Sequence, residues 1–474
     1  MRCPLRALPV VFIAVATCAG AKPPADVLDP LIPVGFSRVD ITPQEPIRLA
    51  GYGDRTEETS KIGHPLMARA LAIGGDPGAG GASGPAVLIT VDLVGVTSDV
   101  SDNVAKELWE RHGIERGRVA VCATHTHTGP MLDSLLTGMF GEELPADQAA
   151  RIHRYTEALK AKLKEVAEAA LADRRPARLA WGQGTLSFAT ARRLVKDGKW
   201  YGFGCDLMGP ADRTMPLLRV TDASGRIRGV LLSYACHNTT LRTEHNFFDP
   251  DWAGDACRRI ESEYADSTAM VALGCAGDTD PEPFGSLELV AKHGLAVATE
   301  VDRLLALPLL PLGPVTGARI ERTSIPLDHA VTREELEKRL MNKDDTVGRL
   351  NASRWLARLN AGQSVDTEVP FTIQYWTFGN SLAMVFFSGE MVSDYSLRLR
   401  RELDGRRLWV NAYSNDVPCY VASSRMFPEG GYEVDYSMNF YGWPTQLAPN
   451  VEDVIISDVR KLLPDGWARA RPLR

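Results

Sequence analysis

Two histidines stand one residue apart in the stretch ATHTHTGP, residues 123–130, of a chain with only nine histidines. The residues before them, 118–122, are apolar and β-branched, which predicts a buried strand. Side chains alternate along an extended strand, so His125 and His127 are expected on one face, converging on one ion or one substrate. Gly129-Pro130 then breaks the strand and leaves both rings at its carboxyl end, where open α/β sheets bind ligands. The alternative is a hydrogen-bonded structural pair.

Four further stretches deliver polar residues at the end of apolar runs. LLSYACH ends in His237, VALGCAGDTDP carries Asp280, MVFFSGE ends in Glu390, and NDVPCYV carries Tyr420 on an irregular segment. Each has an ordinary interpretation, since carboxylates suit helix N-termini and turns and tyrosines often pack half-buried. Jointly they supply imidazole, carboxylate and phenol groups. Zinc takes such nitrogen and oxygen ligands in a four-coordinate site.

The elements that must position these residues alternate along the chain. Apolar runs typical of strands include residues 34–41, 86–96, 229–237, 268–277 and 382–390. Helical spacing of apolar residues is found at 149–172, 255–264, 287–305, 333–359 and 392–403. This interleaving predicts an α/β fold with mixed β-sheets flanked by helices. The glycine-rich stretch 74–84 predicts a hairpin loop, because no Gly-Lys-Ser/Thr follows it.

Composition limits the classes of partner. The chain has 474 residues, of which 45% are hydrophobic, so it can bury a large core. Its formal net charge is -7 and it has no basic run, which gives a nucleic-acid partner little electrostatic basis. No long low-complexity linker divides residues 22–474, so we expect one large catalytic domain there.

The amino terminus has the features of an export signal. A short basic start, an apolar segment too short for a permanent membrane span and Ala19-Gly20-Ala21 predict a signal peptide over residues 1–21 and a periplasmic or secreted protein. Lipidation of Cys18 ranks second, because Thr17 matches a lipobox poorly. The six later cysteines form no C-x-x-C pair and lie mostly in apolar runs, which favours buried free thiols over a disulfide framework.

Six motifs resemble, in order and approximate spacing, those of the catalytic amino-terminal domain of the neutral/alkaline ceramidase family, whose zinc amidases hydrolyse the N-acyl bond of ceramide. The motifs are GYG, THTHTGP, ACHNTT, GDTDP, FFSGE and YVASSRMFPEGGYEVDYS. The resemblance covers nearly the whole chain after the signal segment and leaves no room for the family's separate immunoglobulin-like domain. It implies zinc ligands at His125, His237, Glu390 and Tyr420. It also implies that His127 contacts the substrate amide and that Gly51, Arg192 and Tyr432 line or bind in the substrate pocket.

One position departs from the family pattern. Ceramidases have a serine before the proline of the segment corresponding to GDTDP, whereas this chain has Asp280. The hydroxyl of Thr279 should face elsewhere, because adjacent residues of an extended segment alternate. Without the serine, zinc-activated water becomes the natural attacking group. Asp280 then serves as general base or binds a substrate amino group, or it caps a turn, while His127 stabilises the oxyanion or protonates the leaving amine. Asp251 and Asp278 are weaker candidates, expected to orient other groups or to form turns.

The sequence is compatible with three classes of substrate, which are ceramide, another lipid or envelope amide, and an ester. A lipid substrate would bring peripheral membrane contact, and the stretch MFPEGGY, residues 426–432, is either a lipid-facing lip or an ordinary surface loop. Rival hypotheses are a metal hydrolase of the amidohydrolase-barrel or metallo-β-lactamase type, and a catalytically silent lipid-binding homologue. Retention of all four proposed ligands favours an active enzyme.

Overall fold

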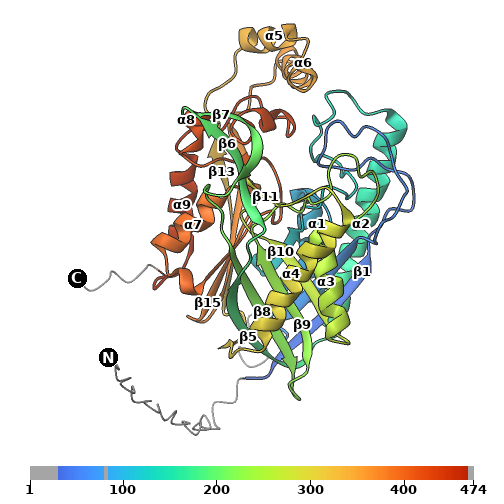
Figure 1. Cartoon of the computed structure of the whole chain (residues 1–474), viewed down its shortest axis with the longest axis vertical. Coiled ribbons are helices and arrows are strands. Elements are labelled where there is room, and N and C mark those ends of the chain that lie inside the picture. Colours follow the sequence, from blue (N-terminus) through green and yellow to red (C-terminus); the bar gives the residue numbers. More distant parts are fainter. Residues whose placement is uncertain (1–29, 79–83, 468–474) are drawn as a thin grey trace, which may run out of the picture.

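The structure is a computed structural model that describes residues 30–78 and 84–467. The expected signal peptide, Cys18 and residues 79–83 of the glycine-rich loop lie outside the described residues. Two β-sheets pack face to face in the middle of the molecule, and helices cover the outer face of each (Figure 1). The predicted α/β fold with mixed sheets and flanking helices is therefore confirmed.

The larger sheet has the strand order β10-β9-β8-β5-β1-β2-β3-β4, with β12 pairing with β5. Its strands are β1 (Ile32–Asp40), β2 (Met67–Ile73), β3 (Ala86–Val91), β4 (Val119–Ala123), β5 (Arg175–Thr185), β8 (Thr214–Asp222), β9 (Ile227–Tyr234), β10 (Thr268–Leu273) and β12 (Leu310–Leu312). Most neighbours are antiparallel, but β3–β4 and β9–β10 are parallel pairs. The histidine-bearing loops follow one strand of each parallel pair.

The smaller central sheet has the order β13-β14-β15-β17, with β13 (Gly317–Pro326), β14 (Glu368–Phe378), β15 (Leu382–Phe387) and β17 (Leu408–Asn411). Alternation along these strands sends Trp376, Met384 and Phe386 against the larger sheet. The intervening residues, such as Val385 and Phe387, pack on the other side with helices α7 (Ser393–Glu402) and α9 (Val451–Leu462). The two sheets thus share an apolar layer that fixes their relative position.

Four helices cover the outer face of the larger sheet: α1 (Ser98–His112), α2 (Ala146–Ala172), α3 (Asp251–Glu263) and α4 (Leu287–Leu305). Helix α1 begins where the Thr97 side chain accepts a hydrogen bond from the Val100 amide, and it ends at Gly113 in the left-handed conformation. The small alanines of β2 face these helices, which allows close helix–sheet packing.

Smaller elements surround one end of this core. A three-stranded sheet has the order β11-β6-β7, with β6 (Ala189–Lys196), β7 (Lys199–Asp206) and β11 (Thr279–Pro281). A two-stranded parallel pair joins β16 (Glu390–Met391) to β18 (Tyr420–Val421). Helices α5 (Arg333–Met341) and α6 (Thr346–Asn360) form a small cluster of their own at the top of Figure 1, and α8 (Met426–Glu429) lies near β7.

Two expectations about elements need correction. The single helical stretch predicted at 333–359 is divided at residues 342–345, where Asn342 leaves the helical conformation and Asp345 caps the next helix through the Gly348 amide. Strands β6, β7 and β8 lie in stretches that the apolar-run pattern did not pick out. Within the described ranges, no helix combines the length and apolar character needed to cross a bilayer. The six cysteines from Cys122 onward are free thiols, and all except Cys205 are buried, as predicted.

Candidate active site

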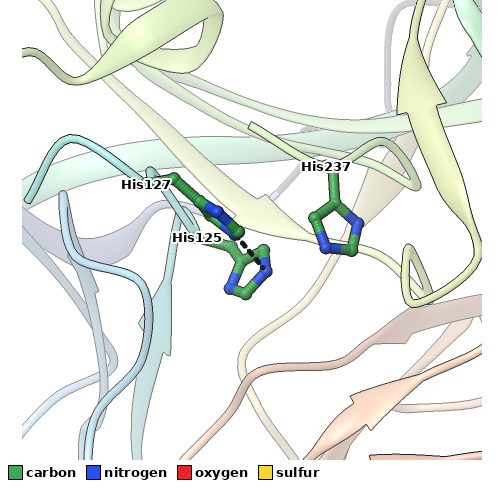
Figure 2. Close-up of side chains that lie close together, drawn as sticks. All are labelled: His125, His127 and His237. Atoms are coloured by element: carbon green, nitrogen blue, oxygen red, sulfur yellow. Dashed lines mark hydrogen bonds between the residues drawn. The ribbon is translucent and has the colours of Figure 1, made fainter. Parts of the chain in front are cut away.

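Two loops at the carboxyl ends of β4 and β9 meet although these strands lie far apart in the order of the larger sheet. The segment after β17 joins the two sides, since the Ala123 amide donates to Tyr413 O and the Ala412 amide donates to Leu273 O at the end of β10. A backbone bridge then pairs Thr126 with Asn238. These contacts bring His125, His127 and His237 together (Figure 2).

The rings of His125 and His127 converge, but not by the predicted route. Strand β4 ends at Ala123, and His125 has a φ of 58°, so the pair does not lie on an extended strand. The positive φ of His125 turns the His125 ring toward His127, so that the Nε2 atoms of the two rings lie 3.1 Å apart. Figure 2 shows the His237 ring facing the same pair from the other loop. A positive φ at a non-glycine residue costs free energy and is found often at functional sites.

Glu390 and Tyr420 reach the histidines from the paired strands β16 and β18, where they are direct neighbours. Glu390 Oε2 lies 3.1 Å from His125 Nε2 and 3.6 Å from His237 Nε2. The Tyr420 hydroxyl lies 3.2 Å from His237 Nε2. The four residues expected to bind zinc are therefore adjacent and buried.

The hydrogen bonds around these groups indicate a cation site. The Nδ1 atoms of His125 and His237 donate to the carbonyl oxygens of Val94 and Ala276, so both Nε2 atoms carry lone pairs. Burial, and then the nearby charge of Arg192, lowers the pKa of His237, which keeps its ring neutral at pH 7.

Glu390 Oε2 is buried and accepts no hydrogen bond. The other oxygen of this carboxylate, Oε1, accepts a hydrogen bond from the Tyr441 hydroxyl, which fixes the orientation of the Glu390 side chain. Two imidazole lone pairs and an orphaned carboxylate oxygen thus face one another. This donor set fits a divalent metal ion such as zinc.

His127 has surroundings different from those of the other two histidines. Its Nδ1 is buried without a hydrogen-bond partner, and burial, followed by His125, lowers its pKa well below the ordinary value. Its ring packs against Gly51, where an added Cβ would lie 2.4 Å from the imidazole. Tyr52 contacts the ring edge at a centroid distance of 4.9 Å. The three histidines form one possible metal-binding set, and two histidines with Glu390 and Tyr420 form the other.

A cavity of about 650 Å³ opens beside these residues. Its wall includes the expected substrate residues Gly51, Arg192 and Tyr432, together with His127, His237, Asp280, Glu390 and Tyr420. The remaining wall is largely apolar and aromatic, with Leu136, Met139, Phe203, Phe284 and Phe440. Binding sites for small molecules commonly combine such apolar walls with a few convergent polar groups.

Asp280 lies in this wall between two guanidinium groups. Its Oδ1 accepts from Arg192 at 3.2 Å and its Oδ2 accepts from Arg242 at 3.1 Å. Burial alone would raise the pKa of Asp280, but the two arginines outweigh burial and hold it below its usual range. A general base must accept a proton near neutral pH, so this environment argues against the proton-accepting role considered for Asp280.

Arg192 is held on several sides. Besides Asp280, it donates to Glu433 Oε1 at 2.9 Å, to the Tyr420 hydroxyl at 3.2 Å, and contacts His237 Nε2 at 3.2 Å. Arg192 therefore lies next to the candidate metal ligands and is not free to move into the cavity. The Thr279 hydroxyl faces away, as expected, and donates to Ala235 O at 2.9 Å.

The weaker candidates lie outside the cavity wall. Asp278 accepts from the Ser393 amide at 2.7 Å, and Asp251 accepts from the Leu241 amide at 2.8 Å, so both orient backbone, as predicted. In the stretch 426–432, Met426 is buried and only Tyr432 reaches the cavity. This stretch packs against Trp200 of β7 at Gly431 and is not a free lip.

Comparison with known proteins identifies the relatives of this fold and site. The model of the neutral/alkaline non-lysosomal ceramidase N-terminal domain matches residues 33–287, which is more than half of the chain. The chain belongs to the neutral/alkaline ceramidase family. The resemblance seen in the motifs is confirmed.

Individual relatives of this ceramidase-family chain are distant. A neutral ceramidase from Pseudomonas aeruginosa is 25% identical over 245 residues, a match that covers 50% of this chain and only 35% of the relative. A solved ceramidase complexed with C2 has a TM-score of 0.66 at 17% identity, covering 94% of this chain and 78% of that one. The crystal structure of neutral ceramidase from Pseudomonas aeruginosa gives a TM-score of 0.64 at 18% identity, with coverages of 94% and 77%.

Several residues of this ceramidase-family site were missed from the sequence. The Tyr441 hydroxyl donates to Glu390 Oε1, Arg242 binds Asp280, and Glu433 binds Arg192. Glu433 stands next to Tyr432 in a motif that was already singled out, and Arg242 is the second residue after the ACHNTT motif. Proximity to those motifs was the available signal.

Proposed function

We propose that this protein is a zinc-dependent amidase that cleaves the N-acyl bond of ceramide or of a related lipid or envelope amide. The observation that carries the proposal is the meeting of His125 Nε2, His237 Nε2 and the orphaned Glu390 Oε2 beside the cavity. Tyr420 would be the fourth ligand, since its hydroxyl is 3.2 Å from His237. When bound, zinc polarises a carbonyl and lowers the pKa of a water molecule.

His127 is assigned to the reacting group and not to the metal. Its Nδ1 lacks the carbonyl partner that orients the other two rings, and metal-binding histidines usually have such a partner. The lowered pKa of His127 keeps the imidazole neutral near pH 7, with one nitrogen protonated and one free. A neutral imidazole in the cavity wall can hydrogen-bond the amide oxygen or transfer a proton to the leaving amine.

Asp280 is assigned a positioning role. Its carboxylate holds Arg192 beside Tyr420 and His237, and it neutralises part of the charge of the Arg192–Arg242 pair. Removing a carboxylate between two partly buried guanidinium groups leaves their charges uncompensated. This assignment replaces the proton-accepting role, because the arginines lower the pKa of the carboxyl.

A lipid substrate is supported by the cavity wall. Apolar and aromatic side chains make up most of the lining of the 650 Å³ cavity, and Arg192, Glu390 and Tyr420 lie next to His237. An acyl chain would contact the apolar part while its amide lies at the polar part. We also propose export and cleavage of the signal peptide near Lys22, on the basic and apolar pattern of the amino terminus.

Fatty-acid release from a short-chain ceramide by the purified protein tests this function. Activity should disappear after dialysis against a zinc chelator and return with added zinc. His125→Ala should lose both bound zinc and activity, whereas His153→Ala, at an exposed histidine of α2, should retain both. Release that survives complete removal of metal would refute zinc dependence, and a metal-loaded protein inactive on amides and esters would indicate a silent lipid-binding homologue.

Asp280→Ser tests the role of the unusual residue in the same assay. The serine restores the hydroxyl typical of the family but removes the bridge between Arg192 and Arg242. A positioning role predicts lower activity with unchanged zinc content, because Asp280 does not contact the proposed ligands directly. A pH–rate profile that shifts with Asp280→Asn would instead support proton transfer by Asp280.

A further inference from the structure

Apolar side chains gather on the hairpin formed by β6 and β7 and on the turn that follows it. Met208 is 93% exposed, Leu207 66% and Tyr201 63%, and Phe203 and Val195 are also exposed. These five residues fall within fourteen positions of the chain and are named here the hairpin surface. Single exposed apolar residues need no explanation, but a concentration of them marks an interaction site.

The hairpin surface continues into the cavity. Phe203 is exposed and also lines the cavity, and Gly204 and Cys205, which precede Leu207 and Met208, lie in the same wall. Phe203 contacts Tyr432 at a ring-centroid distance of 5.1 Å, and Tyr432 contacts Tyr420 at 5.4 Å. A path of aromatic side chains therefore leads from the hairpin surface to a candidate metal ligand.

Strand β7 is an edge strand of its sheet, so its outer side could pair with another chain. Pairing with the same strand of a second copy would need a regular edge. The β6–β7 ladder has register shifts between Ala191 and Arg193 and between Leu194 and Val195. Lys196 and Lys199 are both exposed at the hairpin turn. Bulges and lysines are features that prevent edge-to-edge pairing in natural sheets.

The same composition suits the surface of a lipid aggregate. Leucine, methionine and phenylalanine partition into the acyl region, whereas tyrosine prefers the boundary between acyl chains and water. Residues 195–208 carry two lysines and two aspartates, so the exposed apolar side chains and not a net charge would drive the contact. Figure 1 shows β6 and β7 as a hairpin beside α8.

We propose that the hairpin surface docks the protein on a lipid micelle or bilayer, so that an amphiphile passes along Phe203 and Tyr432 into the cavity. This inference rests on the proposed function to the extent that the substrate is an amphiphile. Docking itself requires neither metal nor hydrolysis. It therefore has a readout independent of the reaction.

Sedimentation with vesicles of phosphatidylcholine containing a minority of phosphatidylglycerol measures docking directly. The double variant Leu207→Ser/Met208→Ser should bind these vesicles at least about tenfold more weakly, because each exposed apolar side chain contributes to partitioning. Leu307→Ser/Leu310→Ser is the matched control, since both leucines are exposed but lie at the start of β12 and just before it. The control should bind vesicles like the natural protein.

Hydrolysis of a water-soluble short-chain amide separates this inference from the proposed function. Neither Leu207 nor Met208 lines the cavity, so the double variant should hydrolyse the soluble substrate at the natural rate and lose activity only on vesicle-borne substrate. Equal vesicle binding by the natural protein and the double variant would overturn docking, even if hydrolysis is normal. A dimer in solution that the double variant abolishes would also overturn it and identify a surface between copies. Vesicle binding that depends on Leu207 and Met208 in a protein inactive on every amide would support docking and refute the amidase.

Discussion

Gly51→Ala isolates the contribution of the His127 ring position. Gly51 has a φ of 102°, and its Cα faces the imidazole, so an alanine Cβ would lie 2.4 Å from both Cγ and Nδ1 of His127. Ordinary carbon contacts begin near 3.4 Å, so the ring must move by 3.4 − 2.4, about 1 Å. A displacement of this size in a reacting group lowers the rate by about 100-fold. The backbone conformation adds a destabilisation of about 1–2 kcal/mol, because alanine resists a positive φ.

The assay is hydrolysis of a short-chain ceramide combined with metal analysis. We expect kcat/KM about 100-fold lower with natural zinc content, because the three atoms nearest to the added Cβ all belong to His127, which is not among the proposed zinc ligands. Gly225→Ala is the matched control: its φ is 90°, and no atom lies within 4 Å of the added Cβ. That variant should show a similar loss of stability in urea unfolding with natural activity.

Two outcomes would refute this reasoning. Natural kcat/KM in Gly51→Ala would mean that the exact position of the His127 ring does not matter for the reaction. Loss of zinc together with activity would mean that His127 binds the metal, which would favour the set of three histidines over the set with Glu390 and Tyr420.

Three further predictions concern groups buried around the site. Glu433→Gln should lower the free energy of unfolding by about 3 kcal/mol in urea titrations, because the Glu433 side chain is fully buried between two arginines. The control Glu429→Gln, at a more exposed carboxylate, should lower the free energy of unfolding by less than about 1 kcal/mol. Equal decreases in the two variants would contradict the argument from burial. Burial raises the pKa of Asp251 from 3.8 to about 6, so the folded state binds the Asp251 proton more tightly than the unfolded state does. The contribution of the protonated Asp251 to stability is therefore complete below pH 3.8 and is lost as pH rises through 6. That loss amounts to about 3 kcal/mol at most, and Asp251→Asn should remove this part of the pH dependence measured by urea unfolding; an unchanged slope would assign it to other groups. Tyr441→Phe should weaken zinc binding about 10- to 100-fold in a competition titration, because Glu390 loses the hydrogen-bond donor that orients it. The control Tyr413→Phe removes a hydroxyl that has no hydrogen-bond partner, and it should leave the zinc affinity unchanged.

Local patterns in the sequence predicted much of the architecture. Helix α4 has the predicted bounds, and strands β1, β10 and β15 overlap their apolar runs, because periodicity reports which face of an element is buried. Helices α5 and α6 were predicted as one, since a short polar interruption looks like one exposed turn of a continuous helix. Strand β6 was missed because two adjacent arginines interrupt its apolar residues, and β7 was missed because its glycines and exposed aromatic residues leave no regular alternation of apolar and polar positions.

The sequence by itself determined which residues were available for the site. Polar side chains that follow apolar strands arrive at the same end of the core, so His125, His237 and Glu390 could be named without coordinates. The tertiary structure decided what surrounds them. The pairing of β11 with β6 places Asp280 beside Arg192, 88 positions away in the chain, and that contact argues against a proton-accepting Asp280. Likewise, the packing of His127 on Gly51 and of Glu433 on Arg192 joins segments 76 and 241 residues apart. No local pattern encodes such pairs, because they arise from the curvature and packing of whole sheets.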